Sequence, residues 1–142
     1  MPKNKSLRLV VDTNIWISFL ISDRQRRLDS LLYIDKVRFL FSTELLDEIN
    51  RTAAKPKLKK YFSVNALEEM LLSLEPYIDI IRVKCLVTIC RDSKDNFLLA
   101  LSKDGKADFL ITGDKDLLDL EKYGRTQILT ISKFLEEVKH YR

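Results

Sequence analysis

The sequence contains little cysteine, glycine or histidine, and each scarcity argues against a class of protein. Cys85 and Cys90 are the only cysteines among 142 residues, and they lack a second Cys or His pair, so neither a disulfide framework nor a zinc site is expected. Only three glycines occur, and none forms a glycine-rich loop after the first apolar run, which disfavours a dinucleotide-binding fold. The single histidine, His140, excludes an RNA-cleaving mechanism that needs two histidines in one chain.

Long apolar runs are also missing. The run that follows the basic N-terminus ends at Asp12, which is too short for a signal-peptide core or a bilayer span. Together with the unpaired thiols, this predicts a cytoplasmic protein with no membrane partner. The net charge is 25 − 21 = +4 at pH 7. Lys55, Lys57, Lys59 and Lys60 form a cluster that either holds phosphates or is a solvated helix face.

The residues that are present fit one globular domain over 1–142, because 46% of them are hydrophobic. Short apolar runs rich in β-branched residues predict strands at 7–11, 37–41, 77–83, 109–111 and 127–131. Helices are predicted at 23–35, from Ser42 or Thr43 onward, and at 64–74, 96–101, 117–121 and 133–139. Strands that alternate with helices predict an α/β fold, a three-layer α/β/α sandwich with a mainly parallel sheet of four to five strands.

Acidic residues follow the apolar runs where these end. Asp12 closes the run 7–11, and Asp114 and Asp116 follow the run 109–111. Neighbouring parallel strands end at the same edge of a sheet, so we expect these acids to converge although about a hundred residues separate them. Carboxylates that crowd together repel each other unless a cation joins them. The sequence therefore predicts a metal site and a hydrolytic enzyme.

Other acids lie in predicted helices, and geometry favours two of them. At about 100° per residue, Glu48 lies about 100° from the centre of its helix's apolar stripe, Glu44 about 140° and Asp47 about 160°. Glu48 flanks the buried face and is best placed to reach the sheet edge, although a solvated helix position is the ordinary alternative. Capping explains Asp92, whereas only the weak helix-dipole effect explains Asp95.

The acids at strand ends also have ordinary structural alternatives. Asp12 could be the N-cap of the following helix, and one of Asp114 and Asp116 could cap the next one. Asn14 could orient Asp12, contact a metal-bound water, or be a turn residue. Two acids in one short loop behind an apolar strand are harder to explain by capping alone.

Four segments, taken in order, resemble the motifs of the PIN-domain nucleases over nearly the whole chain. These segments are VVDTNIWIS (10–18), STELLDEI (42–49), RDSKDNFLLA (91–100) and LITGDKDLL (110–118). The matching acids are Asp12, Glu48, Asp95, Asp114 and Asp116. The segment 127–135 is similar to the ending of a subgroup described as toxins of toxin-antitoxin pairs. Ser93 replaces a proline common in that subgroup and leaves the acids intact.

The resemblance implies a divalent-metal-dependent ribonuclease. Oxygen ligands suit Mg²⁺ or Mn²⁺. By this resemblance, the inner ligands of the metal ion would be Asp12, Asp95 and Asp114. Glu48 and Asp116 would hold metal-bound water or a second ion. Thr112 and Asn14 would support these ligands. Attack by water would leave a 5′-phosphate and a 3′-hydroxyl. An antitoxin protein as partner and a homodimer are also implied.

Two other classes remain open at this point. A phosphatase with Asp12 as its nucleophile would normally carry a second acid two residues later, where this chain has Asn14. A noncatalytic module that binds RNA or docks an antitoxin could carry the same acids with negligible turnover. Metal-dependent RNA cleavage that Asp12→Asn abolishes would separate the enzyme from this module.

Overall fold

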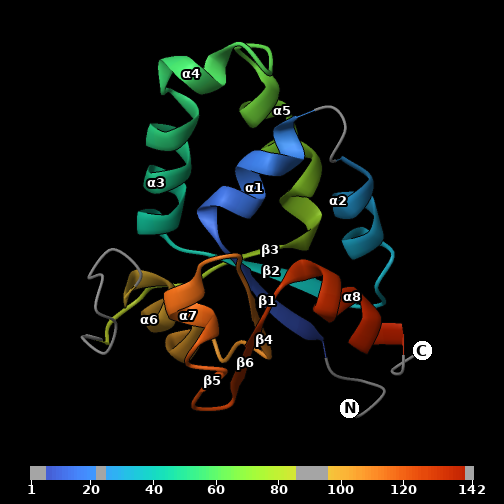
Figure 1. Ribbon diagram of the computed structural model, residues 1–142, viewed down its shortest axis with the longest axis vertical. Helices are drawn as coiled ribbons and strands as arrows, with labels where there is room; N and C mark the ends of the chain where they lie inside the picture. Colours follow the sequence, from blue (N-terminus) through green and yellow to red (C-terminus); the bar gives the residue numbers. More distant parts are fainter. Residues whose placement is uncertain (1–5, 22–24, 86–95, 140–142) are drawn as a thin grey trace.

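The computed structural model describes residues 6–21, 25–85 and 96–139, which form helices around one sheet (Figure 1). The strands are β1 (Leu7–Val11), β2 (Val37–Phe41), β3 (Ile78–Ile80), β4 (Phe109–Ile111), β5 (Lys122–Tyr123) and β6 (Thr126–Leu129). The α-helices are α1 (Thr13–Leu20), α2 (Gln25–Leu32), α3 (Thr43–Ala53), α4 (Pro56–Lys59), α5 (Ala66–Leu74), α6 (Asn96–Asp104), α7 (Lys115–Leu118) and α8 (Ile131–Val138), and a 3₁₀ turn, η2, covers Glu75–Tyr77. Cys90, Asp92, Asp95 and His140 lie outside the described residues.

The sheet has the strand order β3-β2-β1-β4-β6-β5. All pairs are parallel except β5 with β6, which are antiparallel. The predicted α/β class with a mainly parallel sheet is therefore confirmed. The predicted count of four to five strands was too low, because the described residues already form a sheet of six. The strand β5 has only two residues, too few to show any alternation, and it depends on a turn at Gly124, whose φ is +59°.

The strand residues are buried because helices cover both faces of the sheet. In β1 and β2, every residue except the second is buried. In Figure 1, α1, α2 and α8 lie on one side of the strands and α6 and α7 on the other. Trp16 of α1 packs against Phe39 and Phe41 of β2, with ring centroids 5.2 and 5.0 Å apart. This packing holds α1 against β2.

The predicted boundaries agree best where a turn residue marks them. The strands 7–11, 37–41 and 109–111 have the predicted limits, and the side chain of Ser42 accepts a hydrogen bond from the N–H of Leu45 to begin α3. The last strand ends at Leu129, because Thr130 caps α8. The helix α4 was not predicted. Pro56 occupies its first turn, where the missing N–H of proline has no cost.

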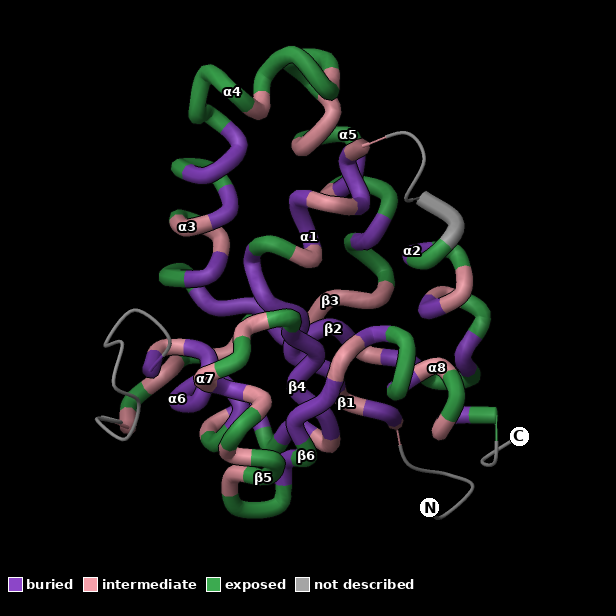
Figure 2. The backbone as a smooth tube through the Cα atoms, viewed as in Figure 1, coloured by how far each residue is buried: buried purple, intermediate pink, exposed green. Residues whose placement is uncertain are grey.

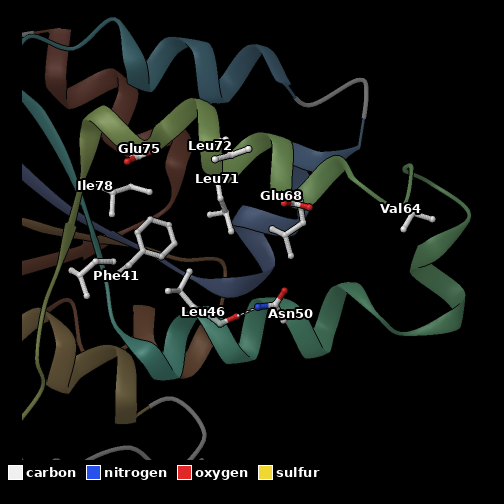
Figure 3. A pocket seen from close by; sticks show the side chains of 11 residues that line it. Phe41, Leu46, Asn50, Val64, Glu68, Leu71, Leu72, Glu75 and Ile78 are labelled. Atoms are coloured by element: carbon white, nitrogen blue, oxygen red, sulfur yellow. Dashed lines mark hydrogen bonds between the residues drawn. The ribbon is translucent and has the colours of Figure 1, made fainter.

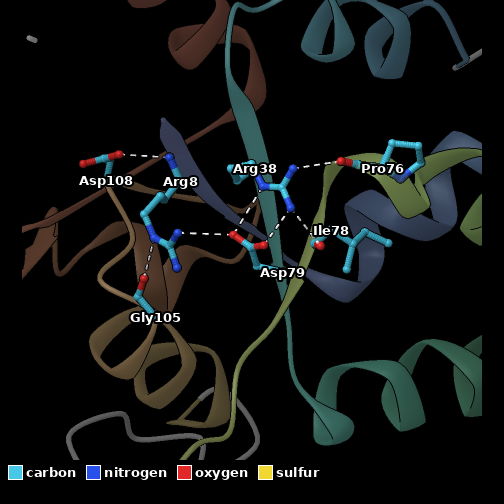
Figure 4. A network of polar contacts seen from close by, with 7 residues as sticks. All are labelled: Arg8, Arg38, Pro76, Ile78, Asp79, Gly105 and Asp108. Carbon is cyan, nitrogen blue, oxygen red and sulfur yellow. Dashed lines mark hydrogen bonds and ion pairs between the residues drawn. The ribbon is translucent and has the colours of Figure 1, made fainter. Parts of the chain in front are cut away.

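A polar network lies at the amino ends of the strands, opposite to the edge where the acids were expected (Figure 4). Arg8 and Arg38 are register partners on β1 and β2, and both contact Asp79 of β3, at 3.2 and 2.7 Å. The Arg8 side chain also donates to the carbonyl of Gly105 (2.8 Å), and its backbone N–H donates to Asp108 (2.9 Å). These contacts join β1, β2, β3 and the loop between α6 and β4.

Burial is concentrated along the central strands and α1, whereas α4 and the turn after it are exposed (Figure 2). Within the described ranges, no helix combines the length and the apolar character that crossing a bilayer requires.

Candidate functional site

Asp12 and Thr112 meet at the carboxyl edge of the sheet. Parallel pairing of β1 with β4 aligns Val11 with Ile111, so the next residues of both strands lie side by side. The N–H of Asp12 still donates to the carbonyl of Ile111 (2.9 Å), and the Thr112 hydroxyl donates to Oδ2 of Asp12 (2.6 Å). Asp12 is 8% exposed and Thr112 is fully buried. The strand register therefore produces a buried, oriented carboxylate.

The loop that follows β4 brings two further acids to this edge. The N–H of Asp114 donates to Oγ1 of Thr112 (3.0 Å), so Thr112 links Asp12 to Asp114. Oδ1 of Asp114 accepts from the N–H of Asp116 (2.8 Å) and caps α7. Both acids are half-buried. Capping thus uses one oxygen of Asp114.

Electrostatics in this cluster favour an added positive charge. Burial is the main cause that raises the pKa of Asp12 above its ordinary value of 3.8, and the negative charge of Asp114 raises it further. The hydrogen bond from Thr112 acts in the opposite direction and lowers this pKa, as do the nearby amides of Thr13 and Asn14. A cation beside Asp12 would offset both unfavourable effects, the loss of hydration and the repulsion from Asp114.

The role of helix N-cap explains the backbone position of Asp12 but not the orientation of its carboxylate. Asp12 is the N-cap residue of α1 by backbone geometry, and its carbonyl accepts from the N–H groups of Ile15 and Trp16. Its carboxylate makes no capping hydrogen bond of normal geometry, although the amides of Thr13 and Asn14 lie near enough to lower its pKa. The buried Thr13 hydroxyl has no hydrogen-bond partner among the described residues. Nothing in the sequence distinguishes Thr13, because threonine is common at the start of a helix.

Glu48 lies on α3 with the partial burial that its helical angle predicted. Glu44 and Asp47 are exposed, whereas Glu48 is half-buried. Its Oε2 contacts the Arg51 guanidinium at 3.0 Å. Asn14 is exposed in the first turn of α1.

Asp95 directly precedes α6 and lies outside the described residues, so its side chain has no place in the geometry above. Helix α6 packs against β1, β2 and β4, and its first residue, Asn96, is buried. Over residues 6–21, 25–85 and 96–139, no three Asp, Glu, His or Cys side chains gather closely enough to hold a metal ion. Hydrogen bonds link Asp12 to Thr112, Thr112 to Asp114, and Asp114 to the backbone of Asp116.

The sequence from residue 8 to residue 116 matches the profile of the PIN domain. The chain belongs to the PIN-domain family. The matched region begins in β1 and ends in the first turn of α7. It therefore contains the carboxyl edge of the sheet with Asp12, Asp114 and Asp116, which we call the acidic edge. PIN domains are generally nucleases that use divalent metal ions and act on RNA, and they often pair with antitoxins.

A relative of similar length supports this assignment. An uncharacterized protein of Methanocaldococcus jannaschii is 30% identical over 146 aligned positions, which cover 95% of this chain and 94% of the relative. The similarity therefore extends past the profile match into β6 and α8.

The PIN domain also has an apolar groove away from the acids, between α3, α5 and β3 (Figure 3). Its volume is about 680 Å³, and Phe41, Leu46, Leu71 and Ile78 are among the side chains that line it. Leu72 and Ile80, at its border, are 62% and 64% exposed. Its apolar lining suits a protein surface more than a charged substrate.

Proposed function

We propose that residues 1–142 form one nuclease domain that hydrolyses phosphodiester bonds inside single-stranded RNA with Mg²⁺ or Mn²⁺. We further propose that it acts in the cytoplasm as the toxin of a toxin-antitoxin pair. The observation that carries the proposal is the buried carboxylate of Asp12, which Thr112 orients and beside which Asp114 adds a second negative charge. Such a cluster has the all-oxygen character that Mg²⁺ and Mn²⁺ prefer.

The fit between these residues and a divalent cation rests on charge and on free donor atoms. The pKa of Asp12 is raised mainly by burial and also by Asp114, which is the situation that a bound cation relieves. The unpartnered Thr13 hydroxyl provides another oxygen at the same strand end. Asp12, Asp95 and Asp114 would hold the ion, and Glu48, Asp116, Asn14 and Thr112 would surround it.

The chain's own residues would prepare the site in three ways. Thr112 fixes the rotamer of Asp12 by donating to Oδ2, and its Oγ1 accepts from the Asp114 backbone. Burial of Asp12 excludes bulk water and strengthens its interaction with any positive charge. The cap on α7 holds Asp114 in one orientation. A bound divalent cation would neutralise phosphate charge and acidify the water that attacks phosphorus.

Incubation of the chain with a mixed pool of single-stranded RNA, in Mg²⁺, Mn²⁺ or EDTA, tests this function. We expect cleavage only with metal, products with a 5′-phosphate and a 3′-hydroxyl, and loss of cleavage in Asp12→Asn. Asp47→Asn, which removes an exposed acid of α3, is the matched control and should cleave normally. RNA binding without a cut in any wild-type lane would support the noncatalytic module. Trapping of a covalent phosphoaspartate at Asp12 would support the phosphatase.

The proposed antitoxin would be a protein with an apolar segment that fits the groove between α3, α5 and β3. Glu68 and Glu75 line this groove, so a partner segment with basic residues beside its apolar ones would match it in charge. Leu72→Glu should abolish complex formation without changing RNA cleavage. A homodimer that closes the same groove would instead appear as a wild-type dimer that Leu72→Glu converts to a monomer.

A further inference from the structure

In the segment from residue 49 to residue 67, every charged residue is basic. The segment contains Arg51 and the four lysines of the α4 cluster, which are Lys55, Lys57, Lys59 and Lys60, and no Asp or Glu. A solvated helix face usually mixes charges of both signs. The absence of acids over several turns leaves a local excess of positive charge, although the whole chain carries only +4.

The lysines of the α4 cluster are exposed and unneutralised. All four belong to the exposed residues in and around α4, at the far end of α3 from the sheet (Figures 1 and 2). None of them forms an ion pair within the part of the chain that the structure describes. Their charges therefore remain available to a polyanion.

An aromatic ring lies directly beside these charges. Tyr61 is 52% exposed, and the Lys60 ammonium lies 5.2 Å from the centre of its ring. A cavity of about 250 Å³ is lined in part by Lys59 and Phe62, which flank Lys60 and Tyr61 in the sequence, and by Val64. Exposed rings among lysines are the combination with which proteins hold single strands, because bases stack on the ring while the lysines contact phosphates.

Helix α3 connects this surface to the acidic edge of the sheet. The helix starts just after β2 and is about 16 Å long at a rise of about 1.5 Å per residue. Glu48 and Arg51 are spaced at i and i+3 on one side of α3, and Lys55 follows shortly after the helix ends at Ala53, at the start of α4. Arg51 contacts Glu48. A single-stranded RNA that is cut at the acidic edge could thus continue along α3 to the lysines of the α4 cluster.

We propose that the α4 cluster and Tyr61 form a binding platform for single-stranded RNA, which holds the substrate several nucleotides from the acidic edge. Cleavage of the bound RNA rests on the proposed nuclease function, whereas binding of RNA to the platform does not. The platform reads backbone charge and base stacking, so it tolerates many sequences.

Binding of a fluorescent single-stranded RNA oligomer, measured by anisotropy in EDTA, tests the lysines without cleavage. The variant with Lys55, Lys57, Lys59 and Lys60 all changed to Gln should bind about tenfold or more weakly, and the slope of log K against log salt should shrink by up to about 3. The matched control changes Lys103, Lys122, Lys133 and Lys139 to Gln, which removes the same charge from exposed positions elsewhere. It should retain most of the affinity.

Tyr61→Ala tests stacking and should weaken binding by roughly fivefold to a hundredfold. Tyr33→Ala is its control, because Tyr33 is 80% exposed but lies outside the basic segment. Thermal unfolding of every variant verifies that the exposed substitutions leave the fold intact.

Equal RNA affinity in the wild type and the α4 lysine variant would overturn the platform, whether or not the chain cleaves RNA. Absence of RNA binding by the wild type would also overturn it, and binding to phosphatidylserine vesicles alone would assign the surface to a membrane. If binding depends on the lysines while the wild type never cleaves, the platform stands and the nuclease proposal fails. If the α4 lysine variant binds weakly and cleaves with a raised KM and an unchanged kcat, both hold.

Discussion

The Thr112 hydroxyl donates a 2.6 Å hydrogen bond to Oδ2 of Asp12, and this bond joins two strand ends that are 100 residues apart in sequence. The same oxygen of Thr112 accepts from the N–H of Asp114. One buried hydroxyl therefore sets the orientation of the first acid and the path of the loop that carries the others. The predictions for the acidic edge depend on this link.

Asp12→Asn should stabilise the chain in the absence of divalent ions. The folded-state pKa of Asp12 lies above the ordinary 3.8, so the folded chain holds the proton more tightly than the unfolded chain does. Stability then falls as the pH rises from about 3.8 to the raised pKa, and the loss stays constant above it. Asparagine removes this loss, so the free energy of unfolding at pH 7 should increase by on the order of 1 kcal/mol.

Urea unfolding in EDTA over a pH series measures this gain, which should shrink as the pH falls toward 3.8. Asp47→Asn, which changes an exposed acid, should show no such trend. A gain that is equal at pH 4 and pH 7 would contradict the assignment of the effect to ionisation of Asp12.

Divalent ions should raise the unfolding temperature through the acidic edge. At a concentration of about 100 times Kd, a bound ion adds roughly 2.7 kcal/mol to the stability. Asp12→Asn and Asp114→Asn should each reduce the shift that Mg²⁺ or Mn²⁺ produces, and EDTA should reverse it in the wild type. Binding requires the ionised form of Asp12, so the shift should weaken as the pH falls toward its raised pKa. If the divalent ion raises the unfolding temperature of both variants as much as that of the wild type, the metal does not bind at this edge.

Thr112→Val should move the pH dependence of RNA cleavage. The hydroxyl lowers the pKa of Asp12, so its removal lets burial and Asp114 raise that pKa further. The acidic limb of the pH-rate profile should therefore shift to higher pH, and stability should fall by about 1 to 2 kcal/mol. Thr112→Ser keeps the hydroxyl and should restore the wild-type limb.

Thr126→Val is the control for loss of a buried threonine. Thr126 is buried and donates to the carbonyl of Ala107 (2.8 Å), before β4 begins. This variant should lose stability, but the acidic limb of its pH-rate profile should stay where it is in the wild type. If both valine variants give the same profile, Thr112 has only a structural role.

Asp79→Asn should weaken the base of the sheet and leave cleavage unchanged. Arg38 is the main cause that lowers the pKa of Asp79, and Arg8 adds to it. The ion pairs therefore stabilise the fold above pH 3.8, and this contribution disappears as the pH falls through the lowered pKa. Because Asp79 is 33% exposed, solvent screening limits the loss at pH 7 to about 1 kcal/mol.

Chemical unfolding at pH 7 and at low pH measures the contribution of Asp79, and Asp35→Asn is a control at an exposed acid. Reduced cleavage in a folded Asp79→Asn variant would show that the two edges of the sheet are coupled.

Local pattern determined much of the framework. The apolar runs 7–11, 37–41 and 109–111 could be assigned from sequence alone, because a strand buried on both faces needs apolar residues along its length. Ser42 could be expected to begin α3 and Glu48 to flank its buried face, because capping and helical angle depend on near neighbours. The short elements α4 and β5 were not predicted, because a proline such as Pro56 fits both a break and a first turn and because two residues show no periodicity.

Only the tertiary structure decided how the acids meet. The sequence places Asp12 and Asp114 at strand ends, but parallel pairing of β1 with β4 and its register set Thr112 between them. The raised pKa of Asp12 likewise follows from burial beneath distant segments and from the charge of Asp114. A strand's identity depends on its own residues, whereas a carboxylate's neighbours and solvation depend on every element that packs around it.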